Sequence, residues 1–340
     1  MTGQNNNGLD LGKLLMAILV VAIHTKPLIN LEIPFILRAY QNITQLAVPF
    51  FFVSTSYLFF IRKNDIYSSS CIEGLYKRIN HFIRLYIIWE IIYFPCILYA
   101  YYHNEHNFVF NMADYARKFF FVGSNYYSSQ LWFLLSMIYI LIIFSFILKY
   151  KLGIKKILAF SVICYIIGAI INQYITTNTE IRLINLFLGY FVSLCNKSTV
   201  LIYILYISLG MVMAKHHVVL SKSKLVVCFC IGFLCEILLP GHPLLITLVK
   251  PFEVIAVFQF FMQLHLNDSP VYIKLRKSST VLYYAHFWFI FLYELIFNVT
   301  AANGPLLFTI CLLCCTLLAI IAMHLRERPR FRWIDIVFGW

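Results

Sequence analysis

A lysine and a histidine stand eleven positions apart in one apolar stretch, DLGKLLMAILVVAIHTKPL, which runs from Asp10 to Leu28. In an α-helix eleven residues make about three turns, so Lys13 and His24 lie on one face, about 16 Å apart along the axis. Imidazole titrates near neutral pH and therefore suits general-base work. The spacing predicts a helix with a cation near one membrane surface and a base toward the other. The structural alternative is a capping histidine with a lysine that reaches the lipid headgroups.

Membrane helices must position these two residues. The chain has 340 residues, of which 61% are hydrophobic and 12% are charged, whereas soluble domains carry about 25% charged residues. Apolar runs of about 18 or more residues recur along the whole chain. We therefore predict an all-α polytopic membrane protein. The net charge of +13 is explained by basic loops that hold the topology, so nucleic-acid binding is not expected.

The lysines and arginines between the apolar stretches predict which stretches cross the membrane. The eleven stretches lie near 10–29, 43–61, 81–102, 131–148, 154–172, 181–195, 199–214, 225–240, 244–264, 280–298 and 305–324. Basic residues cluster at 62–84, 149–156, 215–224, 274–277 and 326–332. All five clusters can lie in the cytoplasm only if residues 181–214 cross the membrane once. In that case the stretch 181–195 lies in the membrane interface or re-enters the membrane without crossing it.

This arrangement predicts about 10 transmembrane helices with both termini cytoplasmic. Residues 1–325 then form a single transmembrane domain, and residues 326–340 form a short basic cytoplasmic tail. The polar connection 103–130 is extracytoplasmic in this topology.

Five stretches in chain order resemble the membrane-bound acyltransferase-3 family. They are LDLGKLLMAILVVAIHT (9–25), VPFFFVSTSYLFF (48–60), YKRINHFIRLY (76–86), QLWFLLSMIYIL (130–141) and LRKSSTVLYYAHFWFI (275–290). The first is similar to the family signature of Arg or Lys, ten residues, then His. Two positions depart from the family pattern. Lys13 stands where Arg is commoner, and Lys cannot make the bidentate contact that Arg makes. Thr55 and Ser56 stand at the usual Ser-Gly.

The resemblance implies an O-acyltransferase of the O-acetyltransferase type, in the bacterial cytoplasmic (inner) membrane. It implies acetyl-CoA as the cytoplasmic acyl donor, and a hydroxyl of a cell-surface polysaccharide or its lipid-linked precursor as the acceptor. Membrane lipid and the glycan are the implied partners. His24 would either take the proton of the acceptor hydroxyl or carry the acyl group itself, and the residues do not separate the two roles.

Further residues join this hypothesis. Five cations are candidates for the phosphates of CoA, with topology alone as their alternative role: Lys13, Arg78, Arg84, Arg276 and Lys277. The possible cavity-lining residues are Asp10, Trp132, Tyr283 and His286. His286 has two possible roles. It helps to hold the acyl donor or a second proton, or it is a histidine of the core with its hydrogen bonds satisfied.

Glutamates in apolar stretches need a partner or a role, because a charge at mid-span costs about 2.5–3.5 kcal/mol on insertion scales. Glu90 follows Trp89 in the third span, which carries residues matched to the family. We predict a catalytic role for Glu90. For Glu236, Glu253 and Glu294 we expect a structural partner or an interfacial position.

Two other functions remain as alternatives. VVAIHTKPL also resembles the first helix of the membrane half of vancomycin-resistance serine racemases, which suggests a transporter of a small molecule such as serine. Those proteins continue into a soluble racemase domain that these 340 residues do not contain, which weakens this interpretation but leaves a transporter that stands alone as an alternative. The third function is a non-catalytic polysaccharide-export protein. No metal site is expected, because the His pairs in loops have no third ligand at a useful spacing.

Overall fold

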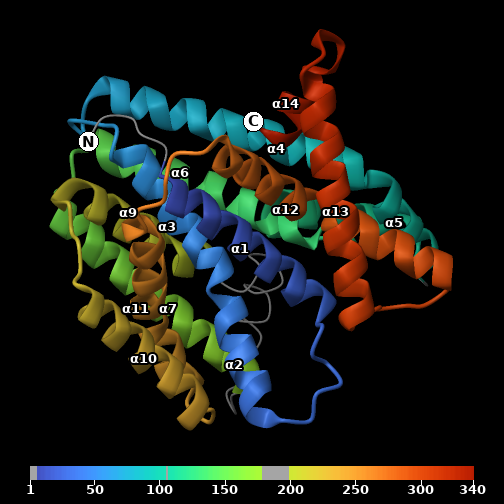
Figure 1. The fold of residues 1–340 in the computed structure, drawn as a ribbon, viewed down its shortest axis with the longest axis horizontal. Coiled ribbons are helices and arrows are strands. Elements are labelled where there is room, and N and C mark those ends of the chain that lie inside the picture. The colour runs from blue at the N-terminus through green and yellow to red at the C-terminus, as the bar shows by residue number, and fades with distance from the viewer. Residues whose placement is uncertain (1–5, 105, 178–198) are drawn as a thin grey trace.

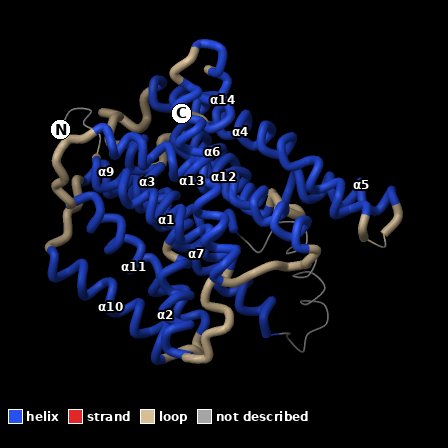
Figure 2. The backbone as a smooth tube through the Cα atoms, turned by 45° about the vertical axis from the view of Figure 1, so that its right-hand side comes forward, coloured by secondary structure: helices blue, strands red, loops and turns tan. Residues whose placement is uncertain are grey.

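The computed structural model describes residues 6–104, 106–177 and 199–340, and within these ranges its regular elements are all helical (Figures 1 and 2). The main helices are α1 (Asn7–Thr25), α2 (Pro34–Gln45), α3 (Ala47–Phe60), α4 (Ser69–Tyr102), α5 (Phe108–Arg117), α6 (Trp132–Lys149), α7 (Ile154–Thr177), α9 (Thr199–His216), α10 (Lys222–Leu238), α11 (Pro243–Gln263), α12 (Pro270–Phe297), α13 (Pro305–Arg326) and α14 (Trp333–Phe338). The predicted all-α fold is confirmed.

Nine helical spans in the described ranges are long and apolar enough to cross a membrane. One of them is the pair α2 and α3, which follow each other as Pro34–Phe60. Helix α10 forms at the expected place but has 17 residues, the lower end of the range for a crossing. The expectation for residues 181–195 concerns a segment outside the described residues. These nine spans confirm a polytopic membrane protein.

Hydrogen bonds between loops bring the basic segments to one end of the helix bundle. The Tyr67 hydroxyl donates to the Leu152 carbonyl at 2.7 Å, which joins the loop after α3 to the turn before α7. The ammonium of Lys215, at the end of α9, donates to the Lys63 carbonyl. Because α7 begins at this end and α9 finishes there, the two helices run in opposite directions.

Both chain ends reach the same end of the bundle. The Asn7 side chain donates to Asp268, in the loop before α12, at 3.1 Å. Gln263 donates to the Leu220 carbonyl at 3.0 Å, which connects that loop to the basic segment after α9. Residues 333–340 fold back, and the Trp89 indole donates to the Val337 carbonyl at 2.8 Å. The shared end is the arrangement that the charge pattern predicts, while its cytoplasmic position stays a prediction.

Small residues set the contact between α3 and α9. The Ser56 hydroxyl donates to the Ile207 carbonyl at 2.6 Å. A Cβ added at Gly210 would lie 2.5 Å from the Val53 carbonyl oxygen and 2.8 Å from the Ser56 Cβ. The close approach therefore depends on a glycine on α9 and on the small side chain of Ser56 opposite it.

We expect Gly210→Ala to lower the stability of the folded protein by about 1–3 kcal/mol, the usual cost of overpacking a core. The atoms that the new methyl group meets belong partly to the α3 backbone, which cannot move away as a flexible side chain can. The thermal unfolding midpoint in detergent measures the effect. Gly153→Ala is the matched control, because no atom lies within 4 Å of a Cβ added there. Equal midpoints for the two variants would contradict the prediction.

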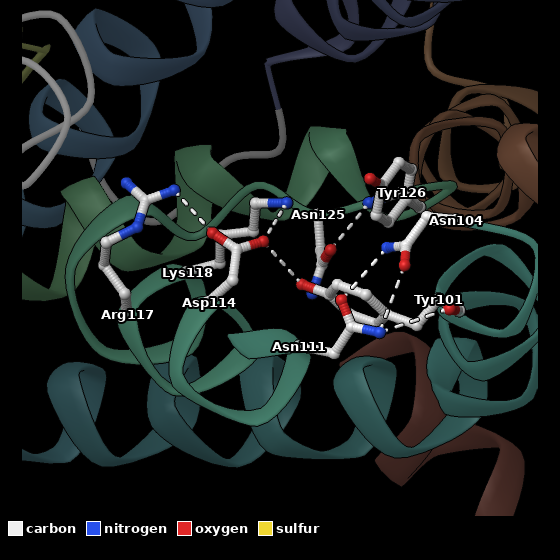
Figure 3. Close-up of polar contacts among 8 residues, drawn as sticks. All are labelled: Tyr101, Asn104, Asn111, Asp114, Arg117, Lys118, Asn125 and Tyr126. Atoms are coloured by element: carbon white, nitrogen blue, oxygen red, sulfur yellow. Dashed lines mark hydrogen bonds and ion pairs between the residues drawn. The ribbon is translucent and has the colours of Figure 1, made fainter. Parts of the chain in front are cut away.

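The connection between α4 and α6 is held by a polar network around Asp114, shown in Figure 3. Asp114 accepts hydrogen bonds from Arg117 at 2.8 Å and from the Tyr101 hydroxyl at 2.8 Å, and it pairs with Lys118 at 2.6 Å. The Lys118 ammonium also lies over the Tyr126 ring, 4.6 Å from its centre. One carboxylate thus ties α5 to the end of α4 and to the loop that leads into α6.

Protonation of Asp114 should loosen this connection. Burial raises the pKa of the Asp114 carboxyl, but hydrogen bonds from Lys118, Arg117 and Tyr101 outweigh burial and hold the pKa below its ordinary value. A carboxyl with a lower pKa in the folded state stabilises the fold above its unfolded pKa, and this contribution is lost as the pH falls below about 4. Hydrogen exchange in residues 108–118 should be faster in Asp114→Asn than in the native protein at pH 6. The two rates should approach each other as the pH falls below about 4. A constant difference across this range would contradict the assignment.

Candidate active site

Helices α1 and α12 lie side by side and run parallel, and α1 crosses the middle of the view in Figure 1. Near their starts, at the basic end, the Asp10 carboxylate lies 3.4 Å from the Arg276 guanidinium. Near the far end of α1, the rings of His24 and His286 stack with their centres 5.3 Å apart. The pairing therefore brings both ends of the Lys13–His24 pattern against residues of the 275–290 stretch.

The end of α1 is capped without the help of its histidine. The Ala22 carbonyl accepts the Tyr40 hydroxyl at 2.6 Å, and the Thr25 carbonyl accepts the Gly304 N–H at 2.7 Å. Neither ring nitrogen of His24 has a hydrogen-bond partner among the residues that the structure describes. The capping alternative is therefore not what the structure shows, and the imidazole of His24 is available to a ligand.

His24 faces a cavity of about 360 Å³. Trp132 and Tyr283 line the same cavity, as do Gln130 and Lys250. The Tyr283 hydroxyl donates to the Gln130 carbonyl at 2.6 Å, so the start of α6 is fastened to α12 at the wall. The other lining residues are Val20, Ile23, Gln45, Val48, Pro49, Phe133, Tyr165, Asn172, Ile202, Tyr203, Tyr206, Ile246 and Thr247. Aromatic rings can pack against the apolar surface of a ligand, and the few amides can hydrogen-bond with its polar groups.

Sequence reasoning missed Gln130 and Lys250. Lys250 stands within an apolar stretch, and a charge in such a place is a signal for a functional or paired residue. Gln130 is the polar residue that opens the Gln-Leu-Trp-Phe-Leu segment, and nothing in its spacing points to a cavity. Its place at the wall comes from the contact between α6 and α12.

Lys250 is held by two of the membrane glutamates. Its ammonium lies 2.9 Å from Glu253 and 3.4 Å from Glu236, and Asn42 donates to Glu253 at 3.0 Å. This network joins α2, α10 and α11 next to the cavity. These two acids thus have the structural partners that the sequence led us to expect.

The third of these acids, Glu294, also has partners. It accepts the Tyr127 hydroxyl at 2.7 Å and the Ala302 N–H at 2.8 Å. These bonds fix the connection before α6 and the loop after α12 to one side chain.

Glu90, the other predicted catalytic residue, lies on α4 away from the cavity lining. It is 3% exposed and lies beside Tyr86, one turn earlier on α4. The Tyr86 hydroxyl donates to the Phe119 carbonyl at 2.6 Å, at the contact with the segment after α5. Glu90 is not among the residues that line the cavity of His24. The structure therefore does not bring the two predicted catalytic residues together at that cavity.

The five predicted donor-site cations fall into separate groups. Asp10, which is buried and does not line the cavity, lies 3.7 Å from Lys13 as well as 3.4 Å from Arg276. Arg78 is close enough to Lys13 to interact with it electrostatically. We call Lys13, Arg78 and Arg276 the inner cation cluster.

The other two cations lie beside this cluster rather than in it. The Lys277 ammonium lies over the Trp340 ring, 4.9 Å from its centre. Arg84 is exposed on α4 and lies 3.3 Å from the His81 ring. His286, expected as a possible cavity residue, is fully buried behind His24 and does not line the cavity. No group of His, Cys, Asp and Glu in the described ranges is arranged to hold a metal ion.

Comparison with known proteins identifies the family of the chain. The model of acyltransferase family 3, described as an acyltransferase domain, matches residues 6–325. An amino-acid racemase of Enterococcus faecalis is 27% identical over 180 residues, which are 53% of this chain and 24% of that protein. The chain thus spans about a quarter of the length of this curated relative. No solved structure shows significant similarity to the chain. Because the family match includes α1, α12 and nearly all of the bundle, the chain belongs to acyltransferase family 3.

Proposed function

We propose that this membrane acyltransferase is an O-acetyltransferase that moves the acyl group of acetyl-CoA to a hydroxyl of a cell-surface polysaccharide or its lipid-linked precursor. The observation that supports this most is the parallel pair of α1 and α12. It places the inner cation cluster at the basic end of the bundle and His24, with no hydrogen-bond partner in the described residues, in a cavity farther along.

The basic end suits the donor. CoA carries phosphates at one end and its thioester at the end of a long pantetheine arm. Arg276 and Lys13 offer several N–H donors to phosphate oxygens, and Arg78 adds a third cation nearby. The separation of about 16 Å between Lys13 and His24 is one that an extended arm can span. In this arrangement the basic end faces the bacterial cytoplasm.

The cavity suits the acceptor. His24 takes the proton from the acceptor hydroxyl as its oxygen attacks the thioester carbonyl. The new C–O bond forms, the C–S bond breaks, and the proton passes to the leaving thiolate. In the second role, a ring nitrogen of His24 takes the acyl group first and then gives it to the hydroxyl. Rapid denaturation near neutral pH within the first turnover distinguishes the two roles, because only the second leaves radiolabelled acyl groups on the protein and an acyl-imidazole is hydrolysed quickly in acid.

The test uses the full chain in lipid nanodiscs with radiolabelled acetyl-CoA and a panel of surface glycans. We expect label on a glycan, release of one CoA per acyl group transferred, and loss of both in His24→Ala. No release of CoA with any glycan or lipid-linked glycan would overturn the proposal.

A second function is favoured by one observation, the similarity of 180 residues to part of an amino-acid racemase. Transport of a small amino acid such as serine would use the same cavity. Serine counterflow in proteoliposomes, together with no consumption of acetyl-CoA, would support transport over acyl transfer.

A further inference from the structure

His286 lies behind His24 and is buried. Its side chain is 0% exposed, and its ring is stacked on that of His24 with 29° between the two planes. The Phe287 ring lies 4.6 Å from His24 and 4.7 Å from His286, measured between ring centres. The two imidazoles are thus held together where α1 meets α12, and one of them faces the cavity while the other does not.

A backbone carbonyl sets the tautomer of His286. Its Nδ1 lies 2.9 Å from the Leu282 carbonyl oxygen, one turn earlier on α12. A carbonyl only accepts hydrogen bonds, so Nδ1 carries the hydrogen and the Nε2 of the neutral ring is an acceptor. This Nε2 is buried and has no hydrogen-bond partner in the described part of the chain.

An unpaired acceptor in a buried place destabilises a protein, and nearly all such groups in native structures have partners. The His24 ring, which is stacked on that of His286, carries one N–H when neutral and has no hydrogen-bond partner in the described residues. Ring nitrogens lie outward from the ring centres, so at a centre separation of 5.3 Å a rotation of the His24 side chain can bring two of them within hydrogen-bond distance.

We infer that His286 is a positioning residue for His24: its Nε2 accepts a hydrogen bond from the His24 ring during acyl transfer. This inference rests on the proposed function. With one N–H of His24 held by His286, the lone pair of the other nitrogen faces the cavity, where the acceptor hydroxyl is to be deprotonated. The arrangement of a base oriented by a third group is the general form of an activated hydroxyl site.

Three substitutions at His286 separate orientation from packing. His286→Asn can keep the bond to the Leu282 carbonyl but has no atom at the position of Nε2. His286→Gln has a carbonyl or amide at about that position. His286→Phe keeps the ring and the burial without either nitrogen. Each variant is assayed for kcat and for the KM of acetyl-CoA, and its folding is checked by elution as a single detergent-solubilised species.

We expect kcat to fall at least about tenfold in His286→Phe and His286→Asn, and by no more than the 10²–10⁴-fold that base catalysis itself contributes. The KM of acetyl-CoA should stay unchanged, because Arg276 of the inner cation cluster lies ten residues earlier on α12, about 15 Å along the helix axis. His286→Gln should recover a substantial part of kcat. Native kcat in His286→Asn or His286→Phe, or no recovery in His286→Gln when it folds, would overturn the inference.

A buried neighbour gives the control. The Cys311 thiol lies 4.0 Å from the His286 carbonyl oxygen on the backbone side, so Cys311→Ala disturbs the packing there and should leave kcat near the native value. The result also separates this inference from the proposed function. Loss of activity in His24→Ala with native activity in all His286 variants would reject the role of His286 alone. Full activity in His24→Ala would reject the proposed base itself.

Discussion

The His24→Ala variant is expected to lose acyl transfer almost entirely, with kcat lower by about 10²–10⁴-fold, the range that a positioned base contributes. His24 lines the cavity, and its ring nitrogens have no hydrogen-bond partner among the described residues. Removal of the ring therefore takes away a proton acceptor and leaves the capping of α1 intact, because other groups make those hydrogen bonds. Transfer of label from acetyl-CoA to the glycan measures the loss.

His103→Ala is the matched histidine control. His103 is exposed, follows the end of α4 and does not line the cavity. Native activity in this variant and loss in His24→Ala would assign the effect to the cavity histidine rather than to histidine content or expression. Retention of full kcat by His24→Ala, with normal folding, would exclude His24 from both of its proposed roles.

The second large effect is expected at the donor end. Arg276→Ala should raise the KM of acetyl-CoA about 10- to 150-fold, because hydrogen bonds to charged groups contribute about 1.5–3 kcal/mol and 1.4 kcal/mol is a factor of ten. The value of kcat should change much less, since Arg276 lies at the end of α12 where it meets Asp10, far from His24. Lys13→Ala should act in the same direction.

Acetyl-pantetheine, which lacks the nucleotide phosphates, sharpens this test. If Arg276 binds those phosphates, Arg276→Ala should leave the KM of acetyl-pantetheine unchanged while it raises that of acetyl-CoA. Lys274→Ala is the control on the same helix, because Lys274 is exposed and has no part in the inner cation cluster. An equal rise with both donors would show that Arg276 acts through the fold and not through the phosphates.

Local sequence features predicted the membrane helices of this protein and the end of the bundle at which its basic loops lie. The low charge content predicted membrane helices, and the helical repeat predicted that Lys13 and His24 share a face. The distribution of lysine and arginine predicted which loops share one end of the bundle, and the bonds of Tyr67 and Lys215 place them there. These features depend on residues that are close in the chain, or on the preference of positively charged loops for one side of the membrane.

Which side chains from different helices meet at the cavity of His24 was not predictable in the same way. Glu90 was grouped with His24 in the sequence, yet the structure places it next to Tyr86 and outside the cavity lining. Lys250 and Gln130 line that cavity and were not expected there. A membrane helix is apolar on its lipid face as well as its packed face, so periodicity does not show which side is buried.

The sequence by itself determined that this chain is a helical membrane protein and that one helix carries a cation and a histidine on the same face. Only the tertiary structure decided what that helix meets. The parallel contact of α1 with α12 joins residues more than 250 positions apart, and it pairs Asp10 with Arg276 and His24 with His286. The physical reason is that helix pairing in lipid depends on close packing and polar contacts between particular faces, and these exist only once the bundle has formed.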